Sequence, residues 1–206
     1  MKTFQVEHVI KWMERTNDKI GQNKEYLTSL DQAIGDGDHG INMVRGFREV
    51  VNKITEQEYE TVADALKDIA MTLISKVGGA SGPLYGTAFL KFSMASKDHD
   101  VTYDTFVKGV EDACNGIKQR GKADVGEKTM LDVWRPVADQ LKKENQFNAD
   151  VVSRTAKEAM ENTKDIMATK GRASYMKERS IGHLDPGAVS SFYLFEALAE
   201  VIQEGA

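Results

Sequence analysis

Three aspartates between residues 31 and 38 are the residues of this chain best suited to chemistry. Asp31, Asp36 and Asp38 lie close together in sequence, and Gly35 and Gly37 each precede one of the last two. On one continuous helix these side chains would point in different directions, because only residues three or four apart share a face. They converge only if a helix stops here, and glycine permits the sharp turn. Carboxylates at such a bend are typical Mg²⁺ ligands, and phosphoryl transfer is the chemistry that uses them.

The same stretch is compatible with a structural role, because most Asp- and Gly-rich segments are solvated turns between helices. The spacing alone leaves both interpretations open. It does exclude a calcium-binding EF-hand loop, since the sixth position counted from Asp36 is Ile41, where that loop requires glycine. Apolar spacing from Ile41 to Phe47 predicts that a new helix begins near His39.

A second glycine-rich stretch, residues 77–86, leads into another predicted helix. Ser81 is the predicted N-cap of this helix, and Pro83 falls in its first turn. Unpaired N–H groups and the positive end of the helix dipole make such a start suitable for binding an anion. A tight turn between two helices would produce the same pattern, so this stretch alone does not decide between the two.

Residues 121–130 superficially resemble a phosphate-binding P-loop, but the required pattern is broken. Glu127 separates the glycine from the lysine of that motif, and no apolar strand precedes the stretch. Thr129 is instead the predicted N-cap of the helix that follows.

The composition is that of an ordinary globular protein, with 41% hydrophobic and 29% charged residues among 206. This length suits one domain, 1–206, with a sizeable core. The net charge of −5 disfavours nucleic acid as the main partner, because phosphate backbones are bound through clustered lysine and arginine. The single Cys114 fits a reducing compartment, and no stretch has the apolar run of a signal peptide or membrane span. We expect a cytoplasmic protein that binds neither nucleic acid nor a membrane.

Apolar residues recur at helical spacing along most of the chain, and no stretch alternates like a strand. Asp98–Asp100 is expected to form a polar loop. Residues 171–187 form the longest irregular stretch, and long loops in compact domains are usually functional. The pattern predicts a single all-α domain of about eight antiparallel helices. The predicted helices cover about residues 6–23, 26–34, 39–54, 62–73, 81–94, 103–120, 131–137 and 148–170, and a last, largely buried helix begins at Asp185–Pro186.

Four irregular stretches, taken together and in order, resemble one protein family. Residues 31–46, 77–86, 121–133 and 171–189 are similar to the nucleotide-binding L subunit of bacterial dihydroxyacetone kinase, the kind that works with the phosphoenolpyruvate phosphotransferase system. The resemblance covers essentially the whole chain. It implies an antiparallel barrel of eight α-helices with the nucleotide at one end, two Mg²⁺ ions, and ADP or ATP as a tightly bound coenzyme.

The resemblance also assigns residues. Asp31, Asp36 and Asp38 match the aspartates that hold the two magnesium ions. It implies no catalytic side chain, which agrees with a phosphoryl transfer that depends on positioning and on neutralising charge. The positions matching nucleotide contacts are His39, Gly40, Ile41 and Asn42 next to the metals, Ala80 and Ser81 in the glycine-rich turn, Gly121 and Met130 beside the adenine, Arg172 as a basic contact, and Asp185, Pro186 and Gly187 near the end of the site.

In the mechanism that the resemblance implies, a phosphohistidine on an M subunit phosphorylates the bound ADP in place. The phosphate then passes to dihydroxyacetone on a K subunit, and a homodimer of this chain is compatible with that scheme. His39 favours the phosphotransferase type of subunit, because related ATP-dependent domains often carry a small residue at this position. Two alternatives stay open: a kinase subunit that exchanges free ATP, acting on another small polyol, and a nucleotide-binding regulatory module without turnover.

Overall fold

The structure is a computed structural model that describes residues 3–97 and 101–205. Asp98–Asp100, for which we expected a polar loop, lies outside the described residues. The regular secondary structure of the described residues is almost entirely helical. Its elements in order are β1 (Thr3–Phe4), α1 (Val6–Gln22), α2 (Lys24–Ile34), α3 (His39–Thr55), α4 (Val62–Lys76), α5 (Ser81–Ala95), β2 (Val101–Thr102), α6 (Tyr103–Gly121), α7 (Leu131–Leu141), α8 (Ala149–Asn162), the 3₁₀ helices η1 (Thr163–Asp165) and η2 (Arg172–Ser180), and α9 (Pro186–Glu204).

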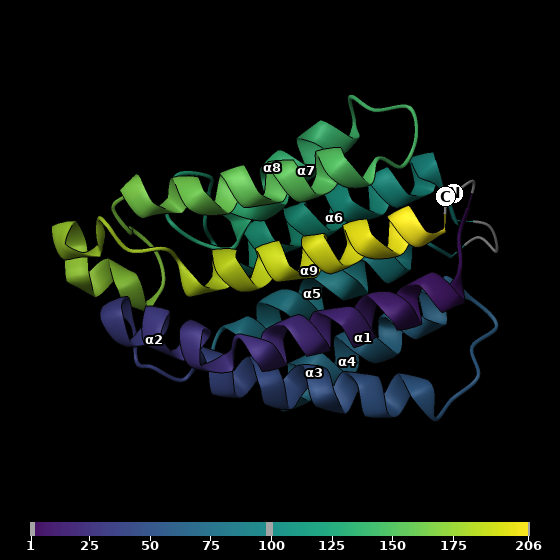
Figure 1. Ribbon diagram of the computed structural model, residues 1–206, viewed down its shortest axis with the longest axis horizontal. Helices are drawn as coiled ribbons and strands as arrows, with labels where there is room; N and C mark the ends of the chain where they lie inside the picture. The colour runs from purple at the N-terminus through teal and green to yellow at the C-terminus, as the bar shows by residue number, and fades with distance from the viewer. Residues whose placement is uncertain (1–2, 98–100, 206) are drawn as a thin grey trace.

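Eight of the described helices close into a ring. Helix α1 packs against α3, the contacts continue in chain order from α3 to α9, and α9 packs against α1. Figure 1 shows these helices running along the long axis, with α2 at one end and both chain termini at the other. Successive helices joined by short connections are antiparallel neighbours. The prediction of an antiparallel all-α barrel is confirmed, and α2 lies at its end.

The ring encloses a continuous apolar core to which α9 contributes on nearly all sides. Leu194, Phe195 and Leu198 of this helix are fully buried, and each large apolar side chain buried in this way contributes about 1.5–3 kcal/mol. The indole Nε1–H of Trp12 on α1 donates to the Leu194 carbonyl at 2.7 Å, which fixes α1 against α9. No helix of the described residues has both the length and the apolar character that crossing a membrane requires.

The predicted helix over residues 148–170 is too long, because α8 ends at Asn162 and a single 3₁₀ turn follows. Lys128, from the loop before α7, explains the early end. Its ammonium group donates to the Thr163 carbonyl at 2.7 Å and to the Ile166 carbonyl at 3.1 Å, so a side chain distant in sequence binds the backbone just beyond the end of α8. Local periodicity cannot reveal a stop of this kind.

The structure also contains two short strands, although no stretch of the sequence has a strand-like pattern. Residues Thr3–Phe4 pair in antiparallel fashion with Val101–Thr102 and connect the start of the chain to the start of α6. Each strand has two residues, which is too short to show the alternation by which strands are recognised in sequence.

Candidate functional site

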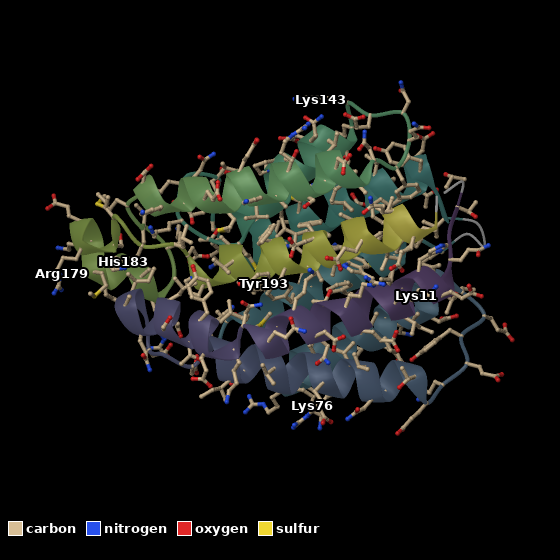
Figure 2. The ribbon with its side chains drawn as sticks, viewed as in Figure 1. Lys11, Lys76, Lys143, Arg179, His183 and Tyr193 are labelled. Atoms are coloured by element: carbon tan, nitrogen blue, oxygen red, sulfur yellow. The ribbon has the colours of Figure 1, made fainter. Side chains whose placement is uncertain are left out.

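A cavity of about 480 Å³ opens at the end of the barrel next to α2. The segment between α8 and α9 reaches the same end, where Figure 2 shows its Arg179 and His183. The cavity is lined by Asp31, Ile34, Asp36, Asp38, His39, Asn42, Gly78, Gly79, Ala80, Ser81, Leu84, Lys128, Thr129, Met130, Lys170, Gly171, Arg172, Ala173, Asp185, Pro186 and Gly187.

Four helix N-termini meet in this cavity. The N-cap residues of α3, α5, α7 and α9 line it, each together with one neighbour, as the pairs Asp38–His39, Ala80–Ser81, Thr129–Met130 and Asp185–Pro186. Each start carries N–H groups without an intrahelical partner and about half a positive elementary charge from its dipole. Because neighbouring helices of the ring run in opposite directions, every second helix begins at this end. The cavity is therefore suited to a multiply charged anion.

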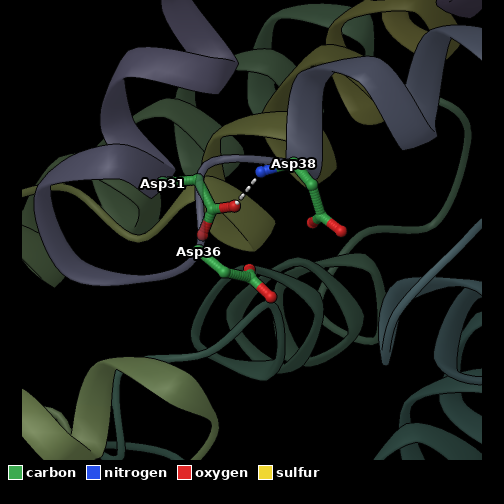
Figure 3. A group of neighbouring side chains, drawn as sticks. All are labelled: Asp31, Asp36 and Asp38. Carbon is green, nitrogen blue, oxygen red and sulfur yellow. Dashed lines mark hydrogen bonds between the residues drawn. The ribbon is translucent and has the colours of Figure 1, made fainter.

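Asp31, Asp36 and Asp38 form a carboxylate cluster on the wall of this cavity. One carboxylate oxygen from each lies within 4.8 Å of the others. Figure 3 shows the three side chains gathered at the bend between α2 and α3, with the Asp38 N–H directed at Asp31. That N–H donates to Asp31 Oδ2 at 2.9 Å, and the His39 N–H donates to the same oxygen at 3.0 Å. The buried member of the cluster is thus held by the start of α3.

The local backbone leaves room for this cluster only because residue 35 is glycine. A Cβ on Gly35 would lie 2.0 Å from Asp31 Oδ1, so any side chain there would displace that carboxylate. Oxygen donors in a compact group match the preference of Mg²⁺. On the open side, Arg172 Nε lies 2.8 Å from Asp36 Oδ2. The residues present therefore fit a divalent cation with a basic side chain beside it.

The glycine-rich stretch before α5 forms another part of the wall. Gly79 has a φ of +66°, a conformation that favours glycine. Gly78 packs against Asn42, whose Oδ1 would lie 2.6 Å from a Cβ at that position. The predicted N-cap is off by one residue, because Ala80 occupies it and Ser81 is the first residue of the helix. The Ser81 hydroxyl is hydrogen-bonded to His39 Nδ1 at 3.2 Å instead of capping the backbone.

His39 joins the cavity wall to the protein core. Its Nε2 lies 2.9 Å from the Ser190 hydroxyl, on the side opposite Ser81. Burial lowers the pKa of His39 to about 4, although the carboxylates of Asp31 and Asp38 raise it. The ring is therefore neutral at pH 7, and one of its nitrogens carries hydrogen while the other accepts.

The loop before α7 contributes Lys128, Thr129 and Met130 to the cavity. The prediction that Thr129 is the N-cap is also off by one residue, because Met130 stands in that place. Asp132, in the first turn of α7, holds the preceding loop instead, since its carboxylate accepts from the N–H groups of Gly126 and Thr129. The Thr129 hydroxyl still accepts from the Leu131 N–H, at 3.2 Å.

Asp185 caps α9 from inside the cavity. Its Oδ2 accepts from the Ala188 N–H at 2.7 Å, which confirms the predicted helix start at Asp185–Pro186. Burial raises the pKa of Asp185 from 3.8 to about 7, opposed by the Ala188 N–H and by Lys128. A carboxyl group that titrates near neutrality thus lies in the wall of the site.

Replacing Asp185 with asparagine is expected to change how stability depends on pH. Between pH 3.8 and about 7 the folded protein keeps a proton on Asp185 that the unfolded chain has lost, so the free energy of unfolding falls as pH rises through this range. Asparagine still caps α9 but cannot ionise. The variant should gain stability relative to the parent between pH 4 and 8, by up to about 1.4 kcal/mol per unit of pKa shift. Urea unfolding at several pH values in metal-free buffer measures this difference, and a constant difference would contradict the prediction.

Most of the residues assigned from the resemblance line one cavity, and three do not. Gly40 lies against α2, where a Cβ would be 2.2 Å from the Lys24 carbonyl oxygen. Ile41 is 50% exposed on α3. Gly121 ends α6 next to Leu84, which does line the cavity. The nucleotide-binding roles of all twelve assigned residues remain predictions. Lys128, Lys170 and Gly171 also line the cavity, although no role for them could be read from the sequence. The only local signal was glycine itself at position 171, where φ is positive.

Comparison with known proteins identifies the family. A family model described as the DAK2 domain matches residues 33–200. The PEP-dependent dihydroxyacetone kinase 1, ADP-binding subunit DhaL, of Listeria innocua is 48% identical over 198 residues, which cover 96% of this chain and 98% of that protein. The PEP-dependent dihydroxyacetone kinase, ADP-binding subunit DhaL, of Escherichia coli is 42% identical over 203 residues, covering 95% of this chain and 97% of that protein.

A solved structure has the same fold. The dihydroxyacetone kinase from C. freundii in complex with AMP-PNP and Mg²⁺ superimposes with a TM-score of 0.76 at 23% identity, covering 97% of this chain and 34% of that chain. At this identity the match establishes the fold alone, whereas the DAK2 match and the two relatives extend over most of the sequence. This chain therefore belongs to the DAK2-domain family, together with the ADP-binding DhaL subunits of PEP-dependent dihydroxyacetone kinases.

Proposed function

We propose that this chain is the ADP-binding subunit of a phosphoenolpyruvate-dependent dihydroxyacetone kinase, a phosphotransferase. An M subunit carrying a phosphohistidine would phosphorylate ADP held in the cavity, and a K subunit would present dihydroxyacetone to the resulting ATP. The observation that carries the proposal is that four helix N-termini and a cluster of three carboxylates face the same cavity. The diphosphate of ADP would bind to the helix N-termini, and its magnesium ions would bind to the carboxylates. Relatives named as ADP-binding subunits support it.

In this proposal Asp31, Asp36 and Asp38 hold two Mg²⁺ ions. Bound there, magnesium would neutralise the negative charge of the phosphate oxygens and favour transfer. The chain's own residues position the site for this. The N–H groups of Asp38 and His39 orient the Asp31 carboxylate, and Gly35 leaves space for it.

The phosphates of the nucleotide would lie against the starts of α3 and α5, with the segments His39–Asn42 and Ala80–Ser81. Met130 and Gly121 would flank the base. Arg172, from the segment before α9, and Asp185–Gly187, at the start of α9, would make further contacts with the nucleotide. Gly40 would contribute by allowing α3 to approach α2 closely. Since phosphoryl transfer needs charge stabilisation and alignment more than covalent chemistry, no side chain of this subunit is required as a nucleophile.

A reconstituted assay tests this proposal. Dihydroxyacetone, phosphoenolpyruvate, the general phosphotransferase proteins and the K and M subunits of a related kinase should yield dihydroxyacetone phosphate only when this chain and a catalytic amount of ADP are added. Omitting the M subunit should abolish the product. Equal turnover with free ATP and no M subunit would instead identify a kinase that exchanges its nucleotide. No product with either donor would favour a regulatory nucleotide-binding module.

A further inference from the structure

The side chain of Arg45 makes two hydrogen bonds beside the cavity, to two different helices. Its Nη2 donates to Asn42 Oδ1 at 2.8 Å, in the first turn of α3. Its Nε donates to the Lys76 carbonyl at 2.9 Å, at the last residue of α4. The final carbonyls of a helix have no intrahelical partner, and the negative end of the dipole attracts a cation there. Arg45 therefore joins the start of α3 to the end of α4, where the glycine-rich stretch begins.

Asn42 is a buried residue of the cavity wall, and its amide is packed against that glycine-rich stretch. A Cβ on Gly78 would lie 2.6 Å from Asn42 Oδ1 and 2.9 Å from Nδ2. Gly46 allows a similar approach one residue after Arg45, since a Cβ there would lie 1.9 Å from Val77 Cγ2. Helix α3 and the glycine-rich stretch are thus in close contact, and the Asn42 amide is confined between them.

The contact with Arg45 determines which way the Asn42 amide faces. A guanidinium group has only donors, so the atom that faces it must be the amide oxygen and the other terminal atom must be Nδ2. Among the residues that the structure describes, Nδ2 has no hydrogen-bond partner, and it is not one of the buried side-chain atoms left without one. The NH₂ group is therefore accessible, and Asn42 lines the cavity.

An NH₂ group on the wall of an anion site is a donor for phosphate oxygens, and hydrogen bonds to a charged acceptor are the stronger ones. Turned the other way, the amide would present its carbonyl oxygen, which suits a cation instead. The neighbouring carboxylates of Asp31, Asp36 and Asp38 already offer oxygen ligands for a cation. The orientation that Arg45 sets is thus the one that suits a phosphate.

We propose that Arg45 is a positioning residue, which holds the Asn42 amide oxygen so that the NH₂ group donates to the phosphates of the bound nucleoside diphosphate. This inference rests on the proposed function and adds to it a residue outside the cavity. Arg45 is exposed and does not itself line the cavity, so it acts through Asn42. The rigid fork of a guanidinium suits this role, because it binds the amide and the end of α4 in one geometry.

A double-mutant cycle tests whether Arg45 acts through Asn42. In calorimetric titrations with ADP and Mg²⁺, Arg45→Met should weaken binding about threefold to tenfold, because the amide is free to turn. In an Asn42→Ala background the same substitution should change ADP binding by less than about twofold, since no amide remains to be oriented. Arg48→Met is the matched control, because it removes the same charge from another exposed position of α3 and should leave the affinity unchanged.

The cycle separates positioning from a merely structural role. Arg45→Met also leaves the Lys76 carbonyl without its donor, and urea unfolding of each variant measures the stability lost with it. If Arg45 served only to hold the end of α4, its replacement would weaken ADP binding equally with and without the Asn42 amide. That result would overturn the proposal.

Asn42→Asp tests which atom of residue 42 meets the nucleotide. Aspartate keeps an oxygen for Arg45 and nearly the same shape, but it replaces the NH₂ group with an anionic oxygen. It should weaken ADP binding in Mg²⁺ by at least about tenfold. Unchanged or tighter binding would mean that residue 42 offers its oxygen to a cation, and the inference would be wrong.

The wild-type titration distinguishes failure of this inference from failure of the proposed function. A wild type that binds no ADP would overturn both. A wild type that binds ADP, together with an Arg45→Met variant that binds it equally well, would overturn the role of Arg45 alone.

Discussion

Replacing Asp36 with asparagine is expected to weaken Mg²⁺-dependent ADP binding by at least about tenfold, or about 1.4 kcal/mol, without lowering the thermal midpoint. Asp36 is one of three carboxylates within 4.8 Å, so the variant loses a third of the negative charge that attracts the cation. Its side chain is 38% exposed, and its ion-pair partner Arg172 is 70% exposed. An exposed pair of this kind contributes little to stability. Titration calorimetry with ADP, with and without Mg²⁺, measures the loss.

The matched control is Asp104→Asn, which removes the same charge at the first turn of α6, beside the paired strands. Its ADP affinity should equal that of the parent. Asp31→Asn provides a second comparison, because Asp31 also accepts the N–H groups of Asp38 and His39 and should therefore lower stability as well as affinity. Unchanged Mg²⁺-dependent binding in Asp36→Asn, with a normal circular dichroism spectrum, would contradict the assignment of the cluster to a metal.

Replacing Lys128 with methionine is expected to lower the free energy of unfolding by about 2–4 kcal/mol. The side chain is 1% exposed, and its ammonium donates to the carbonyls of Thr163, Ile166 and His183. Methionine keeps the length of the side chain but leaves these acceptors without their donor. The segment that carries Arg172 and Asp185 is held at both ends by this one group. Urea unfolding measures the stability, and hydrogen exchange of residues 163–185 measures how far the segment loosens.

Lys164→Met serves as the control for this variant, because Lys164 belongs to the same segment but is exposed. It should change stability by less than about 0.5 kcal/mol and leave hydrogen exchange unaltered. Nucleotide affinity should follow the loosening and fall in Lys128→Met alone. A Lys128→Met protein as stable as the control, with the same exchange in residues 163–185, would show that the ammonium does not hold this segment.

The local parts of the fold could be predicted from the sequence, because they depend on neighbours along the chain. In α1 and α4, for example, the apolar residues recur at helical spacing within the helix itself. This spacing places them on one face, and that face is buried. The carboxylate bend is also local, since Asp31, Gly35 and Asp38 are joined by one turn. The helix starts at His39 and Pro186 were likewise indicated by residues within a few positions.

Interactions between distant segments could not be predicted in this way. Nothing near Asn162 indicates that α8 ends there, because Lys128 supplies the reason from 34 positions away. Ser190 resembles an ordinary residue of an apolar helix, and its hydrogen bond to His39 depends on the closure of the ring. The meeting of four helix starts in one cavity has the same origin. It follows from the antiparallel order of the barrel and from no single motif.

Whether the cavity binds ADP together with magnesium can be read from the nucleotide content of the purified protein. The protein would be denatured directly after purification in Mg²⁺, and the released nucleotide would be identified and quantified by chromatography. We predict close to one ADP per chain, or the same stoichiometry after ADP and Mg²⁺ are added to protein stripped by EDTA. Absence of bound nucleotide in both preparations would contradict the account.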